Sequence, residues 1–96
     1  GGYQNCKLFV QELTGVCRIK DLPSKPFDKK TLKIGDILAW WNGLHYAVYL
    51  GNEEVMEVEE WGASPRISRL QDVIEEHEMP EYQYTIPKQN PRRRRL

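Results

Sequence analysis

Cysteine is scarce in this chain: only Cys6 and Cys17 carry a thiol among 96 residues. Two thiols cannot build a disulfide framework. The two histidines, His45 and His77, lack the close ligand spacing that structural zinc sites usually show. A single domain of this length also has a small core, which leaves little room for a large enclosed cofactor. We therefore expect no metal and no organic cofactor.

Long apolar runs are missing as well. No segment approaches the roughly 18 apolar residues that are needed to cross a bilayer, so we expect no membrane span. No secretory signal is recognisable, and Gly1 in the place of Met is typical of a processed or trimmed chain start. These features do not predict a compartment.

Net charge is also absent, because 14 acidic residues balance 14 lysines and arginines. The signs are unevenly placed: residues 51–81 hold ten of the acidic residues, whereas residues 88–95 hold five basic residues and no acidic one. We expect one domain over residues 1–87 and a flexible basic tail over residues 88–96. Nucleic acid could bind only through Arg92–Arg95 of that tail; the alternative is a disordered, solubilising end.

The first segment has the pattern of a helix over residues 5–14. Cys6, Phe9, Val10 and Leu13 fall on one helical face, and Asn5 is a good N-cap. Gly15 suits the left-handed residue that ends many helices. The proline-containing segment that follows, residues 21–34, predicts an exposed loop with a short helical turn near residues 28–32.

Strand patterns dominate the rest of the chain. The dipeptides Asn42–Gly43 and Gly51–Asn52 separate three β-rich runs, so they predict a meander with tight turns. A fourth strand, a short helix and a closing strand complete the pattern. The expected ranges are strands 36–41, 45–50, 54–61, 65–70 and 81–87, and a helix over 70–79. The fold class is therefore α+β: an N-terminal helix packed on a bent antiparallel sheet or half-barrel of about five strands.

Three residues in this arrangement are candidates for thiol chemistry. Cys6 stands at a predicted helix start, where the dipole and unpaired N–H groups favour a thiolate. Such a nucleophile needs an imidazole, and the imidazole needs a polar partner to orient it. His45 begins a strand, and hairpin pairing places Glu57 opposite it on the next strand. Glu59 shares that face and replaces Glu57 if the register shifts by two.

Each of these residues also has an ordinary structural interpretation. Cys6 lies on the apolar face of its helix, and cysteine is among the most buried residue types. His45 fits a half-buried strand ring, and Glu57 fits a solvated acidic face. Cys17 shows no partner signal and is expected to be a packing residue. It is the order of the elements, a cysteine helix, a histidine hairpin and then an acid, that favours chemistry.

That order resembles the NlpC-type cell-wall peptidases, a branch of the papain-like cysteine hydrolases, with the CHAP amidases as near relatives. Residues 5–10, NCKLFV, are similar to the family's DCSGFV-like motif, and residues 35–40, GDILAW, to its GDLVFF-like strand. Residues 45–58, HYAVYLGNEEVMEV, match the family's histidine strand without a gap. The resemblance spans about residues 3–87 and implies a papain-like core.

The resemblance implies that Cys6 is the nucleophile, His45 the general base and Glu57 the third polar residue. It also implies an oxyanion or substrate role for Tyr3 and Asn5. The family's Ser and Gly after the cysteine are Lys7 and Leu8 here, so the substrate stays open between a cell-wall peptide and another amide or isopeptide. The implied activity is that of a cysteine peptidase or amidase that forms a thioester and needs no cofactor.

A different function class remains open from the same residues. The stretch 35–58 also resembles an SH3-like or Tudor-like barrel, in which aromatic side chains line a groove for peptides. In that case Trp40, Trp41, Tyr46 and Trp61 would form the binding groove, and Cys6 would be inert.

Overall fold

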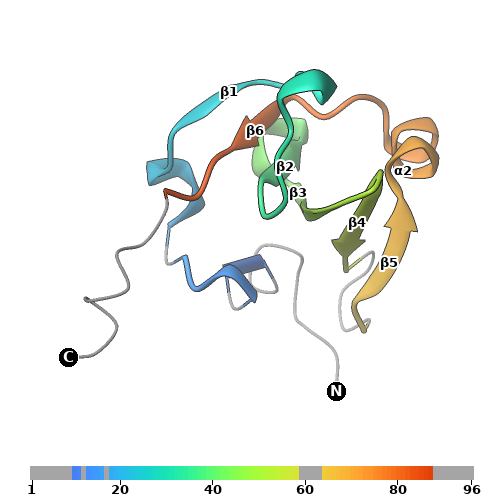
Figure 1. The fold of residues 1–96 in the computed structure, drawn as a ribbon, viewed down its shortest axis with the longest axis horizontal. Helices are drawn as coiled ribbons and strands as arrows, with labels where there is room; N and C mark the ends of the chain where they lie inside the picture. Colours follow the sequence, from blue (N-terminus) through green and yellow to red (C-terminus); the bar gives the residue numbers. More distant parts are fainter. Residues whose placement is uncertain (1–9, 12, 17, 59–63, 88–96) are drawn as a thin grey trace.

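A computed structural model of the chain describes residues 10–11, 13–16, 18–58 and 64–87. Within these residues the protein is a small α+β fold with one α-helix and an antiparallel sheet of six strands that does not close (Figure 1). The strands are β1 (Ser24–Pro26), β2 (Ile37–Trp40), β3 (His45–Gly51), β4 (Glu54–Glu57), β5 (Arg66–Arg69) and β6 (Tyr82–Tyr84). The helix is α2 (Leu70–His77), and the short 3-10 helices are η1 (Ile19–Asp21), η2 (Lys29–Thr31) and η3 (Trp41–Gly43).

The strand order in the sheet is β1-β6-β2-β3-β4-β5, and every neighbouring pair is antiparallel. The expected meander is therefore present as β2, β3 and β4, and β5 extends it on one side. The closing strand β6 returns to pair with β2, as Figure 1 shows. The prediction of an α+β fold built on an antiparallel sheet is confirmed, and this sheet does not close. The papain-like core remains an expectation.

One strand was expected to be loop. Residues 24–26 form β1, which pairs with β6 at the edge of the sheet. Pro23 and Pro26 favour a loop because proline cannot donate to a ladder, but an edge strand tolerates it where that donor is not needed. Among the residues that the structure describes, the sheet therefore has six strands where about five were expected. The helical turn expected near residues 28–32 is present as η2.

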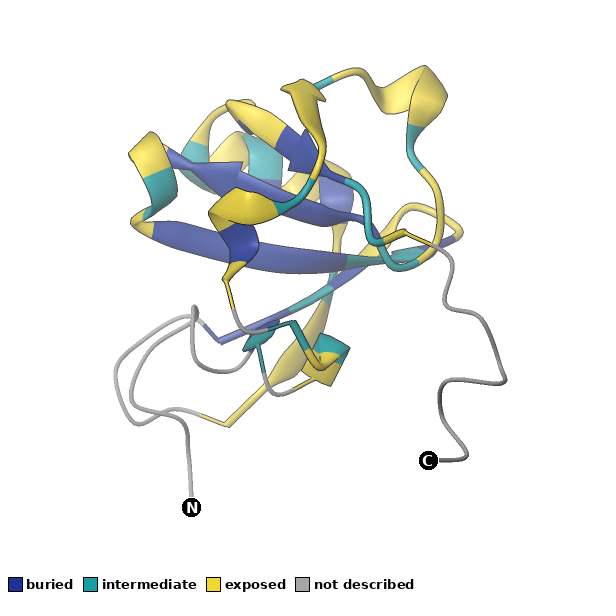
Figure 2. Ribbon diagram, turned by 90° about the vertical axis from the view of Figure 1, so that its left-hand side faces the viewer, coloured by how far each residue is buried: buried dark blue, intermediate teal, exposed yellow. Residues whose placement is uncertain are grey.

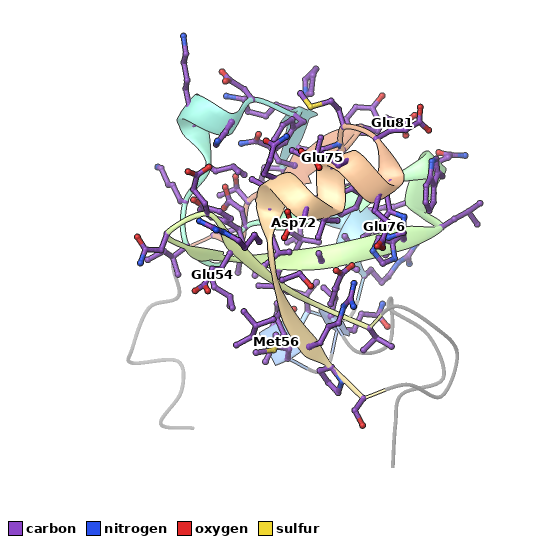
Figure 3. All side chains as sticks on the ribbon, turned by 90° about the vertical axis from the view of Figure 1, so that its right-hand side faces the viewer. Glu54, Met56, Asp72, Glu75, Glu76 and Glu81 are labelled. Carbon is purple, nitrogen blue, oxygen red and sulfur yellow. The ribbon has the colours of Figure 1, made fainter. Side chains whose placement is uncertain are left out.

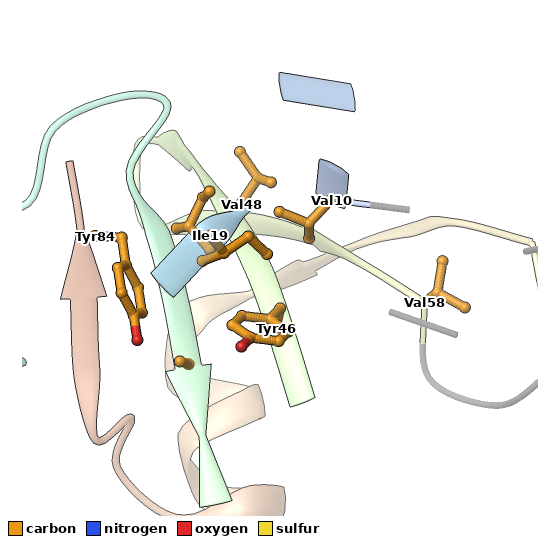
Figure 4. Packing of buried hydrophobic residues seen from close by; sticks show 8 residues of the cluster. Val10, Ile19, Tyr46, Val48, Val58 and Tyr84 are labelled. Carbon is orange, nitrogen blue, oxygen red and sulfur yellow. The ribbon is translucent and has the colours of Figure 1, made fainter. Parts of the chain in front are cut away.

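Both faces of the sheet bury apolar side chains, since the central strands alternate between two clusters. Figure 2 shows that the central strands are buried, and Figure 4 shows the first of the two clusters. We name the faces after their largest residues. The Tyr46 face contains Val10, Ile19, Ile37, Ala39, Tyr46, Val48, Val58 and Tyr84. The Trp40 face contains Leu38, Trp40, Ala47, Val55, Leu70 and Val73. Helix α2 contributes Leu70 and Val73 and so covers the Trp40 face.

Only the end of the predicted N-terminal helix lies among the described residues. Val10, Gln11, Leu13 and Thr14 have helical backbone, and Gly15 donates to the Gln11 carbonyl at 2.9 Å. Gly15 has a φ of 75°, as the predicted left-handed stop requires. The remainder of that helix, including its expected start at Asn5, lies outside the described residues and stays a prediction.

Candidate functional site

One end of the sheet brings together the terminal residues of several elements. His45 is the first residue of β3, and Glu57 is the last residue of β4. Trp40 ends β2 and pairs directly with His45. Because neighbouring strands are antiparallel, the end of one lies beside the start of the next. Helix α2 crosses the same face and ends at His77, which places a second imidazole at this end of the sheet.

The side chains of His45 and Glu57 form a buried hydrogen bond. The distance from His45 Nε2 to Glu57 Oε1 is 2.9 Å, and the residues are only 5% and 0% exposed. A carboxylate at one ring nitrogen holds the imidazole in a fixed orientation and favours the tautomer with its proton on that nitrogen. The expected contact between these two side chains is therefore present in the structure.

The register that was expected to produce this contact is wrong. Glu57 pairs with Ala47 and not with His45, and the turn lies at Asn52–Glu53, one residue later than expected. A bulge between Tyr49 and Gly51 absorbs the extra residue. The resulting shift is two residues, which leaves Glu57 on the same face as His45 because side chains alternate with a period of two. Glu57 then reaches His45 diagonally.

The electrostatic setting of Glu57 favours the carboxylate anion. Burial raises the pKa of Glu57, but the hydrogen bond and charge of His45, the Ser68 hydroxyl and Arg66 together bring it below the ordinary value. Among described residues, Glu57 Oε2 has no hydrogen bond of normal geometry, and Arg66 Nη2 lies 3.7 Å from it. The buried Glu57 carboxylate thus has a short hydrogen bond to His45 and a more distant cation in Arg66.

Aromatic rings enclose the two histidines. The centroids of His45 and His77 are 4.9 Å apart, and Trp41 contacts His77 edge-on at 5.2 Å. Trp40 packs against both imidazoles, with centroid distances of 5.2 Å to His45 and 6.4 Å to His77. These rings remove water from the imidazoles and strengthen every polar interaction between them.

The Trp40 indole also fixes the end of α2. Its Nε1 donates to the Glu78 carbonyl at 2.8 Å, directly after His77. Glu78 has a φ of 80°, outside the helical range, and so ends the helix there. This bond satisfies a carbonyl that the helix end would otherwise leave unpaired, and it holds His77 beside His45. Trp41 contributes a weaker contact to the Glu78 carboxylate at 3.3 Å.

His77 was not identified from the sequence as a site residue. It stands 32 positions after His45, so no local spacing joins them. One signal was present: His77 follows Leu70, Val73 and Ile74 on the apolar side of α2, where a solvated histidine is not expected. Its Nε2 is buried without a hydrogen bond to a described residue, although Glu76 Oε1 lies 3.3 Å away.

Several residues with predicted roles lie outside the described part of the chain: the candidate site residues Tyr3, Asn5, Cys6, Glu59 and Trp61, the expected packing residue Cys17 and the tail 88–96. The nearest described residue of the cysteine segment is Val10, which packs on the Tyr46 face (Figure 4). His45 lies at the end of β3 on the opposite face, in contact with Trp40. The structure thus joins two of the three residues that were expected to act together.

The expected aromatic groove does not form from the residues that can be placed. Trp40 is buried in one cluster and Tyr46 in the other, on opposite faces of the sheet. Only Trp41 of these three is exposed, at 42%. Trp40 pairs with His45, so these two side chains share one face of the sheet. Tyr46 follows His45 along β3 and therefore points to the opposite face from Trp40.

The arrangement offers three donor atoms to a cation. One ring nitrogen of His45, one of His77 and a carboxylate oxygen of Glu57 all lie within 4.8 Å of one another. Nitrogen and oxygen donors of this kind suit zinc and related divalent ions. The sequence-based expectation of no metal relied on spacing along the chain, and the fold brings distant ligands together.

Comparisons with known proteins give no family for this chain. Neither a scan against family models nor a search of curated proteins finds a match. No helix in the described ranges has the length and apolar character that a bilayer span requires.

Proposed function

We propose that the protein is a cysteine hydrolase that cleaves an amide bond through Cys6, His45 and Glu57. The observation that carries the proposal is the buried hydrogen bond of 2.9 Å between His45 Nε2 and Glu57 Oε1. A carboxylate at Nε2 assigns the other nitrogen, Nδ1, to the thiol. This division of the ring between an acid and a nucleophile is what thiol catalysis requires.

The reaction proceeds in two stages. Nδ1 of His45 takes the proton of the Cys6 thiol, and the thiolate attacks the amide carbonyl carbon. Glu57 stabilises the imidazolium through Nε2–H, while backbone N–H groups near Asn5 and Cys6 and the Tyr3 hydroxyl stabilise the oxyanion. The C–N bond breaks, and the amine leaves with the proton from Nδ1. Water, deprotonated by the same imidazole, then hydrolyses the thioester and regenerates the thiol.

The proposal makes a definite demand on the chain before Val10. Val10 packs on the Tyr46 face, whereas the His45 ring contacts Trp40 on the other face. The thiol must therefore reach His45 around the end of β3. His45 is the first residue of that strand, and the loop before it contains the exposed residues Asn42 and Leu44.

Thiol labelling tests the proposal without a known substrate. The protein is treated with iodoacetamide at pH 6, and alkylation of each cysteine is followed by peptide mass spectrometry. A thiolate that is paired with an imidazole reacts at this pH, whereas an ordinary thiol with a pKa near 8.5 reacts slowly. We expect Cys6 to react at least about tenfold faster than Cys17, which serves as the internal control.

If the proposal is correct, the rate of Cys6 alkylation depends on His45 and Glu57. We expect His45→Ala and Glu57→Gln to slow alkylation of Cys6 and to leave Cys17 unchanged. Equal rates at both cysteines in the unmodified chain would contradict the proposal. Turnover is then measured with cell-wall stem peptides and with isopeptide substrates, comparing Cys6→Ala with Cys17→Ala. Loss of turnover is expected for the first variant only, with stability changed by less than about 1 kcal/mol.

A further inference from the structure

The geometry points to a divalent-cation site, suited to Zn²⁺, that is formed by His45, Glu57 and His77. The three residues come from β3, β4 and α2, and no motif in the sequence joins them. Their donor atoms lie within 4.8 Å of one another, which is close enough for small side-chain rotations to bring them onto one ion. The site does not depend on Cys6 or on hydrolysis.

Two of the donor groups are buried without full hydrogen bonding. Glu57 is completely buried, and no hydrogen bond of normal geometry joins its Oε2 or His77 Nε2 to a described residue, although the Ser68 hydroxyl acts on the Glu57 carboxylate and Arg66 Nη2 lies 3.7 Å from Oε2. Buried polar atoms nearly always have partners, so two such atoms at one place are unusual. A cation held between the Glu57 carboxylate and the His77 ring would supply an interaction to both side chains, since a carboxylate oxygen and a ring nitrogen of these residues lie within 4.8 Å of each other.

The chemistry of the donor set fits zinc. Two imidazoles and one carboxylate make a three-ligand set, and such sites leave one position for water or another ligand. Glu57 supplies a carboxylate oxygen from a fully buried position beside both rings. His45 Nε2 can bind a metal ion once the proton of the neutral ring has moved from Nε2 to Nδ1. The ion then takes the place of the proton that Nε2 shares with Glu57.

Residues around the three ligands hold His77 in place and leave a solvent-open hollow beside the site. The Trp40 indole holds the end of α2 and therefore His77, as a supporting residue does in a metal site. Glu76 Oε1 lies 3.3 Å from His77 Nε2 and adds a second negative charge beside the donors. Arg66 and Glu76 also line an open hollow between β5 and α2, and Figure 3 labels Glu76 beside that helix.

This site deepens the proposed function, and only the following consequence rests on that proposal. An ion on Nε2 forces the ring proton onto Nδ1, the atom that must accept the proton of Cys6. Metal binding and thiol activation are therefore mutually exclusive. Zn²⁺ would act as a reversible inhibitor, and a chelator would restore the reactivity of Cys6.

The test is a calorimetric titration of the full, chelator-stripped chain with Zn²⁺ alone. We expect one ion per chain with a dissociation constant on the order of 1–10 μM. Glu57→Gln and His77→Ala should each weaken binding by at least about tenfold. Glu75→Gln is the matched control, because Glu75 is an exposed residue on α2 outside the site. Co²⁺ replaces Zn²⁺ in a parallel experiment, where intense visible absorption reports inner-sphere ligation.

One further variant and the pairing of the two ligand variants keep the test decisive. A Cys6→Ala/Cys17→Ala chain removes both thiols and should bind Zn²⁺ as the unmodified chain does. His77→Ala changes a residue at the helix end, so it reports on the site even if Glu57→Gln does not fold. Binding that survives both Glu57→Gln and His77→Ala, or that needs the thiols, overturns the inference, as does no binding at all. Cys6 alkylation is measured separately in chelator, so the hydrolase proposal can fail or succeed independently.

Discussion

Glu57 bonds to His45 across a diagonal of the sheet, since it pairs directly with Ala47, two residues further along β3. The position of this pair therefore depends on the turn at Asn52–Glu53 and on the bulge before it. The turn and the bulge both lie at the end of the β3–β4 hairpin that is far from His45 and Glu57. A shift by one residue would move Glu57 to the Tyr46 face and separate it from His45, so turn geometry specifies the site.

The first prediction concerns the stability that this pair provides. Glu57→Gln keeps the size of the side chain but removes its charge, which weakens a buried hydrogen bond to His45. We expect the free energy of unfolding at pH 7 to fall by about 1–3 kcal/mol. Urea denaturation measures the change. Glu54→Gln, at an exposed position on the same strand, should stay within about 0.5 kcal/mol of the unmodified protein. Similar effects for both variants would contradict a special role for Glu57.

The second prediction concerns pH and applies to the chelator-treated protein. The folded-state pKa of Glu57 lies below the ordinary value of 4.5, so the unfolded chain takes up the proton first as pH falls. The stability that the anion contributes is present above pH 4.5 and is lost as pH falls through the folded-state pKa. We expect the unfolding curves of the unmodified protein and Glu57→Gln to converge in acid. A difference that grows below pH 4.5 would reverse the assigned sign.

The third prediction concerns the anchor of α2. Trp40→Phe removes the indole donor to the Glu78 carbonyl and part of a fully buried ring. We expect the free energy of unfolding to fall by about 2–4 kcal/mol and Zn²⁺ binding to weaken, because His77 loses its fixed position. Trp41→Phe is the matched variant: Trp41 is 42% exposed, and its indole bond is longer at 3.3 Å. It should lose less than about 1 kcal/mol.

Much of the sheet could be predicted because its signals are local. Alternation in residues 54–58 places Val55 and Glu57 on one face and Met56 and Val58 on the other, as found. The dipeptides Asn42–Gly43 and Gly51–Asn52 correctly predicted the two hairpins, but they did not predict the length or backbone geometry of the turns. Asn42–Gly43 lies in a four-residue loop in which Trp41, Asn42 and Gly43 all have positive φ. Local propensity identifies a turn, whereas the contacts of the neighbouring segments decide its length.

The site was predictable only where one hairpin contained it. His45 and Glu57 stand 12 positions apart on neighbouring strands, so pairing alone brings them together. His77 reaches them through α2 packing on the Trp40 face, which no short sequence pattern contains. The same limit explains why Trp40 and Tyr46 do not share a groove. The resemblance to an SH3-like or Tudor-like barrel grouped Trp40 with Tyr46, but the pleat of paired strands places their side chains on opposite faces.

The fourth prediction concerns the loop before His45. A Cβ atom at Gly43 would lie 2.6 Å from the buried Tyr46 hydroxyl, and the φ of Gly43 is 89°. Gly43→Ala therefore suffers both backbone strain and a clash. Gly35→Ala is the matched control, since its φ is 95° and nothing lies within 4 Å of its added methyl group. We expect a loss of about 1 kcal/mol at Gly35 and about 2–4 kcal/mol at Gly43, measured by thermal unfolding. Equal losses would show that the clash is relieved without cost.

The fifth prediction concerns the cation beside the donors. Arg66 Nη2 lies 3.7 Å from Glu57 Oε2 and 3.8 Å from Glu76 Oε1, so its charge opposes a metal ion at the site. Arg66→Gln should therefore tighten Zn²⁺ binding by about three- to tenfold, and the gain should shrink in high salt. Arg69→Gln is the control, because Arg69 ends the same strand and pairs with Glu54 away from the site. Calorimetry decides the point: weaker binding by Arg66→Gln would mean that Arg66 orders the Glu57 carboxylate for the ion.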